Sequence, residues 1–110
     1  MHYPVAIALR GIPASSALEH YIGDEARKLG RICDRIVSCQ AVAEALQGQK
    51  RLGAQFAVRL IVTLPGTEVV VNREHADDLH MAVREAFAAA GLQLKDHMLR
   101  RRSTQDPPGR

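Results

Sequence analysis

The feature that most constrains the fold is the segment 54–72, where two runs of alternating apolar residues flank a Pro-Gly pair. A period of two places every second side chain on one face of a strand, and Pro65-Gly66 is a turn sequence. We therefore predict a β-hairpin. Its apolar face must be covered by other parts of the chain. On the first strand that face is expected to carry Phe56, Val58, Leu60, Val62 and Leu64.

Residues 16–32 have the spacing of an amphipathic helix that can provide this cover. Ser16 and Glu19 match a capping box, and Gly30 marks the expected end of the helix. The opposite side is charged, with acidic residues early and basic residues late, which suits the helix dipole. The predicted apolar stripe consists of Leu18, Tyr21, Ile22, Ala26, Leu29 and Ile32.

A second and longer amphipathic helix is predicted from the aspartates at 77–78 to about residue 100. Asp77 or Asp78 is expected to cap its N-terminus. Gly91 interrupts it at a cost of about 1 kcal/mol relative to alanine. Its apolar stripe consists of Leu79, Val83, Ala86, Phe87, Ala90, Leu94 and Met98.

The remaining elements complete a β-α-β-β-β-α order. Alternating apolar residues predict strands at 4–9 and 35–46, with a polar loop at 47–53. We predict an α+β fold, a single domain whose four-stranded sheet carries both helices on one face. The other face is expected to be polar, with Arg59, Thr63 and Glu68 on it. The strand at 36–46 is a candidate for pairing with a second copy. Residues 1–102 form the predicted domain and 103–110 a flexible tail.

Basic residues gather where the two predicted helices end. The formal net charge is +3, and the whole excess lies within residues 95–110. This asymmetry favours a polyanionic partner, although a basic helix end also suits the dipole. Only four aromatic residues occur, and three fall on core positions, so any RNA contact is expected through phosphates rather than stacked bases. A third basic pair, Lys50 and Arg51, lies in the polar loop.

The motifs of common enzymes and metal sites are absent from the sequence. There is no glycine-rich phosphate loop and no H-E-x-x-H, so neither a cofactor nor a metal is expected. Cys33 and Cys39 match no zinc or redox spacing and are expected to be buried thiols. An enzyme would need a histidine beside Cys33 or Asp78, which nothing in the sequence places there. The chain has no signal-peptide pattern, so a cytoplasmic location is expected.

Two long segments resemble the ribosome hibernation-promoting factor family, also called ribosome-associated inhibitor A, protein Y or sigma-54 modulation protein. "ALEHYIGDEARKLGRICDRI" (17–36) is similar to the first helix of that family and "DDLHMAVREAFAAAGLQLKDHMLRR" (77–101) to its last helix. The order and separation of the two segments match a divergent short form, and the resemblance covers about residues 5–102. It implies a protein that regulates translation under stress and is not an enzyme.

The resemblance also implies a partner and a set of contact residues. Family members bind the small ribosomal subunit in the decoding channel, contact rRNA phosphates with basic residues of both helices, and block mRNA and tRNA. No contact with DNA or a membrane is expected, and the oligomeric state is left open. The resemblance, taken with the basic helix ends, predicts these rRNA-binding residues: Arg27, Lys28, Arg31, Arg35, Lys95, His97, Arg100, Arg101 and Arg102.

The sequence departs from the family pattern in the middle of the basic ridge. Glu25 stands where family members often carry lysine, and Ala88, Ala89 and Leu92 replace positions that are commonly charged. An alternative function is therefore a non-ribosomal protein-interaction module that has lost most of its rRNA contacts. The double-stranded-RNA-binding fold has a related element order, but its lysine cluster is missing here.

Overall fold

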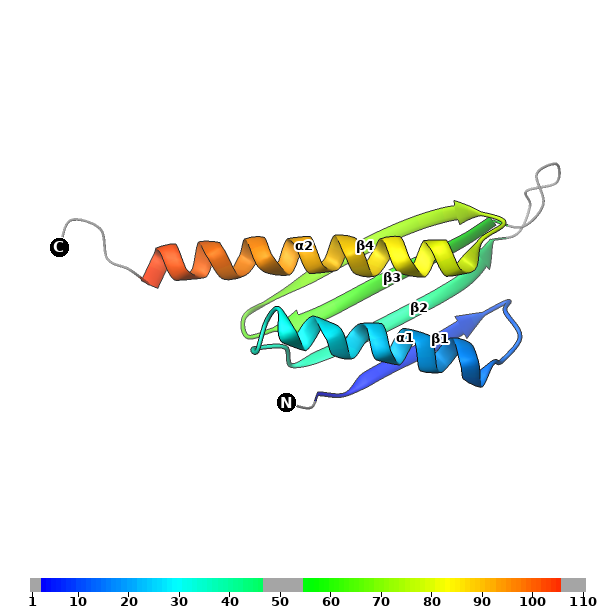
Figure 1. The fold of residues 1–110 in the computed structure, drawn as a ribbon, viewed down its shortest axis with the longest axis horizontal. Helices are drawn as coiled ribbons and strands as arrows, with labels where there is room; N and C mark the ends of the chain where they lie inside the picture. The colour runs from blue at the N-terminus through cyan, green and yellow to red at the C-terminus, as the bar shows by residue number, and fades with distance from the viewer. Residues whose placement is uncertain (1–2, 47–54, 106–110) are drawn as a thin grey trace.

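The computed structural model describes residues 3–46 and 55–105 and has the predicted β-α-β-β-β-α order. The first helix, α1 (Ser16–Lys28), is continued by a single 3₁₀ turn, Leu29–Arg31, and the last, α2, spans Leu79–Gln105. The α+β fold class is confirmed (Figure 1). The strands are β1 (Val5–Arg10), β2 (Ser38–Leu46), β3 (Gln55–Leu64) and β4 (Thr67–Ala76).

The strands form one mixed sheet in the order β1-β2-β3-β4. β1 pairs with β2 in parallel, because α1 carries the chain back to the start of the sheet, and the other two pairings are antiparallel. β2 is therefore an inner strand whose backbone is paired on both sides. The prediction that it pairs with a second copy is wrong, because β1 already occupies the edge that such a partner would need.

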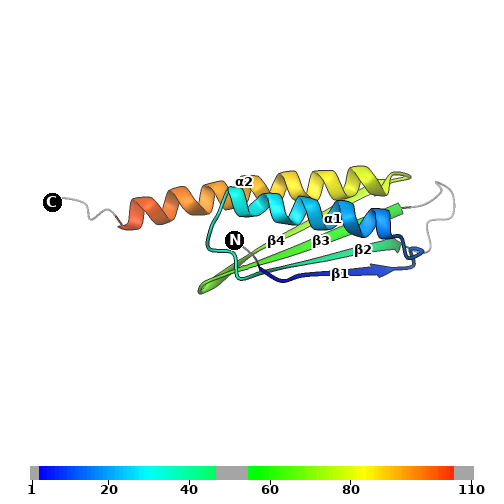
Figure 2. The ribbon, with the colours of Figure 1, turned by 60° about the horizontal axis from the view of Figure 1, so that its bottom comes forward.

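Both helices lie on the same face of the sheet, as predicted. They run side by side and in the same direction, with α2 over β3 and β4 and α1 toward β1 (Figures 1 and 2). The C-terminal part of α2 extends past the β3–β4 turn and past the end of α1 (Figure 1). Its last turns are thus displayed outside the two-layer body.

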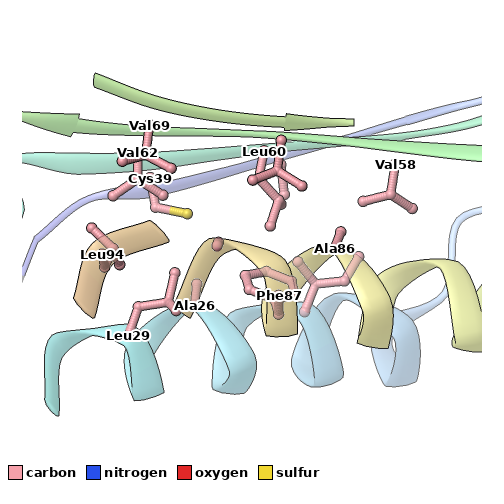
Figure 3. Close-up of a cluster of buried hydrophobic side chains, with 14 of the residues drawn as sticks. Ala26, Leu29, Cys39, Val58, Leu60, Val62, Val69, Ala86, Phe87 and Leu94 are labelled. Carbon is pink, nitrogen blue, oxygen red and sulfur yellow. The ribbon is translucent and has the colours of Figure 1, made fainter. Parts of the chain in front are cut away.

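The core fills the space between the helix layer and the sheet (Figure 3). Leu60 and Val62 on β3 meet Phe87 and Leu94 on α2, and all four are at most 4% exposed. Phe56 is only half-buried and lies outside this core, so the predicted apolar face of β3 begins at Val58. Small side chains at the helix–sheet contact allow close approach; on α2 these are Ala82, Ala86 and Ala90.

The helix caps differ from the sequence prediction by one residue at α1. Ser15, with φ −147°, is the N-cap, and its hydroxyl accepts a hydrogen bond from the Leu18 amide at 3.2 Å. The predicted Ser16–Glu19 capping box is therefore wrong, since Ser16 is already helical. Gly30 does not end the helix in a left-handed conformation but lies within the 3₁₀ turn. The N-terminus of α2 is capped by Asp78, whose carboxylate accepts a hydrogen bond from the Met81 amide at 2.9 Å.

Two elements are longer than expected. β4 continues to Ala76 because β3 begins at Gln55 and the two strands pair along their whole length. α2 reaches Gln105 rather than about residue 100, and the Arg100–Asp96 ion pair supports its last turns. The predicted loop at 47–53 lies outside the described residues, and the division between a domain and a tail at residue 103 stays a prediction.

The uncovered face of the sheet is less polar than predicted. The register places Thr63 opposite Glu68, and Arg59 between Val42 and Asn72. The same face also carries apolar side chains that are half-buried by their neighbours: Val42, Ile61 and Val70. The expected polar residues are present, but an apolar patch lies among them.

Candidate nucleic-acid interface

A groove of about 300 Å³ runs between α1 and α2 on the outer side of the helix layer. Its floor is apolar and is formed by Leu29, Ile32, Phe87 and Gly91. Charged side chains line the same groove from both helices. They are Glu25 and Lys28 on α1, and Arg84 and Lys95 on α2. The groove thus brings three cations and one carboxylate together on the outer surface.

Arg84 was not among the residues predicted from the sequence. It lies on α2 about three turns before Lys95, and this spacing places both on the same side of the helix. The spacing itself is visible in the sequence. What the sequence does not show is that this side of α2 faces α1, so that Lys28 completes the group.

Intrahelical ion pairs hold several of the predicted cations. Lys28 Nζ lies 3.0 Å from Glu25 Oε2, and Arg27 Nη1 lies 3.2 Å from Asp24 Oδ1. The cations of both pairs are more than half exposed, and such surface pairs contribute only about 0.3–0.5 kcal/mol. A phosphate can therefore replace the carboxylate at little cost.

The other predicted residues of α1 lie beside the groove rather than in it. Arg27 and Arg31 line a second surface hollow of about 400 Å³ together with Lys28, so these three cations form one neighbourhood at the end of α1. Arg35 is exposed in the segment between the 3₁₀ turn and β2, and it lines neither hollow. The structure thus groups three of the four predicted α1-side cations.

The basic end of α2 does not form a single ridge. His97 and Arg101 follow Leu94 at spacings of three and four, and both are half-buried. Arg100 follows His97 by three residues, on the same side of the helix, and its guanidinium is 2.8 Å from Asp96. Arg102 belongs to α2, but its side chain lies outside the described residues. Lys95 is the predicted α2 residue that the structure brings to the groove.

An aromatic pair lies between the two helices. Tyr21 on α1 stacks on His80 of α2, with ring centroids 4.0 Å apart and planes inclined by 15°. Burial, reinforced by the Glu25 carboxylate, raises the pKa of Tyr21 above its ordinary value, while Arg84 and Lys28 oppose the shift. Tyr21 therefore stays protonated at neutral pH and lies in the same electrostatic neighbourhood as the groove. His80 was not identified from the sequence.

The residues that an enzyme would need have structural roles. Cys33 and Cys39 are each 1% exposed, and burial raises the pKa of Cys39 to about 11. A thiol in that environment is a poor nucleophile. Asp78 caps α2. Within residues 3–46 and 55–105, no group of three His, Cys, Asp or Glu side chains has the arrangement of a metal site.

Neither helix in the described part of the chain is both long and apolar enough to cross a membrane.

Comparison with known proteins identifies the fold and the family pattern. The family model described as sigma 54 modulation protein / S30EA ribosomal protein matches residues 5–102. A solved structure of a ribosomal subunit interface protein from Coxiella burnetii superposes with a TM-score of 0.70 and 22% identity, covering 87% of this chain and 98% of that one. The N-terminal domain of Thermus thermophilus Protein Y gives 0.69 and 25%, covering 86% and 96% respectively. A search of curated proteins found no match.

Proposed function

Because this chain belongs to the sigma-54 modulation protein / S30EA ribosomal protein family, we propose that it binds the small ribosomal subunit and stops translation by occlusion. In this function the cations of α1 and α2 contact rRNA phosphates in the decoding channel, where the protein excludes mRNA and tRNA. Binding alone produces the effect, so no chemical step is required. Its place of action is the cytoplasm, where ribosomes work.

The observation that carries this proposal is the meeting of Lys28, Arg84 and Lys95 along one groove. Three cations from two helices line one groove and can neutralise a backbone that carries regularly repeated negative charges. Arg27 and Arg31 extend the same surface along the outer side of α1. Lys and Arg side chains on such a surface neutralise phosphates and read no base sequence.

Salt dependence gives the test. Co-sedimentation of the protein with small ribosomal subunits is measured at increasing salt, for the unaltered chain and for the double variant Lys28→Glu with Lys95→Glu. Each lost phosphate contact lowers the magnitude of the slope of log K against log salt by about 0.7–0.9. We expect the double variant to bind more weakly and to show a shallower slope.

Arg59→Glu is the control, because Arg59 is exposed on the uncovered face of the sheet, away from both helices. It should leave the affinity nearly unchanged. Arg59→Glu changes the formal charge by half as much as the double variant, so a loss of half the size would show that net charge, rather than the groove, determines binding. In the same assay, bound protein should displace a labelled mRNA fragment from the subunit, and simultaneous binding would refute occlusion.

A further inference from the structure

The floor of the α1–α2 groove has a chemistry that phosphate binding does not use. It is formed by Leu29, Ile32 and Phe87 and by Gly91, whose missing side chain lets Ile32 approach the helix closely. A nucleobase would need an exposed aromatic ring for stacking, but Phe87, the aromatic residue in the lining, is only 4% exposed. An aliphatic surface of this kind suits apolar side chains of a protein.

Exposed leucines extend this floor along α2. Leu92 is 68% exposed and Leu99 is 63% exposed, which makes them the two most exposed large apolar side chains among the residues that the structure describes. Ala88, Leu92, Lys95 and Leu99 recur at spacings of four, three and four, so they form one stripe on the outer side of the helix. This stripe is separate from the core stripe and is about 16 Å long at 1.5 Å per residue.

The charges of the groove indicate what kind of protein segment fits it. Lys28, Arg84 and Lys95 line it against a single carboxylate, Glu25, which Lys28 already contacts. These three cations form the rim of the groove, and a ligand that complements them carries negative charge. A second copy of the chain would bring the same three cations to the contact, and like charges facing each other oppose association.

We propose that the groove between α1 and α2 binds an acidic amphipathic helix of another protein, about three turns long. Its apolar side chains contact Leu92, Leu99 and the floor, and its carboxylates pair with the three cations of the rim. This is the helix-in-groove mode of recognition. It goes beyond the ribosome-binding function and requires no ribosome to be tested.

A displayed library of helix-forming 15-residue peptides, selected on the full chain, provides the probe. We expect the enriched peptides to combine leucine, isoleucine or phenylalanine at helical spacing with a net negative charge. Enrichment of basic peptides, or no enrichment, would overturn the proposal. So would concentration-dependent self-association of the chain that Leu92→Gln abolishes, because it would assign the groove to a second copy.

Variants then locate the binding of a selected peptide. Leu92→Gln with Leu99→Gln should weaken it roughly tenfold or more, since burial of a leucine side chain is equivalent to at least about one tenfold step. Val37→Gln is the matched control: Val37 is 50% exposed and lies outside the groove. It should change the affinity less than about twofold. All three positions are exposed, so the variants keep the fold, which their melting temperatures verify. Equal effects of the groove and control variants refute the docking site.

Discussion

Gly91→Ala tests whether the interior of α2 can accept a side chain where it faces α1. Gly91 is helical and buried, and a Cβ added there would lie 3.2 Å from Cδ1 of Ile32. That atom is the tip of a half-buried side chain rather than backbone. Ile32 therefore needs to move by only a few tenths of an ångström.

Two opposing terms set the size of the effect. Alanine is favoured over glycine in a helix interior by about 0.8–1 kcal/mol. The adjustment of Ile32 costs less than the roughly 0.5–1.5 kcal/mol of a side chain displaced well away from its rotamer. We expect a net stabilisation of about 0.5 kcal/mol. For a chain of this size, that raises the melting temperature by about 2–4 °C.

Thermal and urea unfolding, followed by circular dichroism, measure this change. Gly66→Ala is the control, because the β3–β4 turn holds Gly66 at φ +78° with nothing within 4 Å of the added Cβ. There the strain of a left-handed conformation should destabilise the protein by about 1 kcal/mol. A lower stability of Gly91→Ala, with Gly66→Ala behaving as expected, would show that Ile32 cannot move and would refute the reasoning.

Three further predictions concern charge, a thiol and a cap. Glu25→Lys adds a cation to the groove, so it should tighten binding to the small subunit and steepen the salt dependence of that binding in co-sedimentation. Glu68→Lys makes the same charge change on the uncovered face of the sheet and should alter neither. Burial raises the pKa of Cys39 from 9.0 to about 11, because the folded protein keeps the thiol neutral. The contribution of the neutral thiol to the free energy of unfolding is therefore complete below about pH 9 and is lost as the pH rises through 11. Urea unfolding should therefore show a larger loss between pH 9 and 11 in the unaltered chain than in Cys39→Ala, and equal losses would contradict the assignment. Ser15→Ala should cost about 1 kcal/mol in the same unfolding assay, and Ser16→Ala much less; the reverse order would restore the capping box that the sequence suggested.

Most of the fold could be predicted because its elements bury alternate residues or one helical stripe. The alternation around Leu60 and the Pro65-Gly66 turn indicate the hairpin, and the stripes through Ile22 and Leu94 indicate the helices. The prediction was wrong at the ends of elements, where a single hydrogen bond determines which residue is the first of a helix. Two adjacent serines are equally good cap residues, and only the extended backbone of Ser15 selects it.

The candidate site was predicted less completely. Lys28 and Lys95 were identified from basic helix ends, and the structure brings both to one groove. Arg84 was missed because it lies near the start of α2, away from the basic helix ends on which the prediction rested. The last basic residues were expected to act together, but Lys95 lines the groove and His97, two residues later, lies on another side of the helix. The number of basic residues in a segment does not tell on which side of the helix each side chain lies.

By itself the sequence determined the element order, the apolar face of each element and the family, because these depend on spacing along the chain. Only the tertiary structure decided which side of α2 lies next to α1, and this determines which cations share a groove. That choice follows from how the helices pack on β3 and β4, which is a property of contacts between distant segments. The basic run at the end of the chain is therefore divided: Lys95 lines the groove, and the last turns of α2 extend beyond the body of the protein.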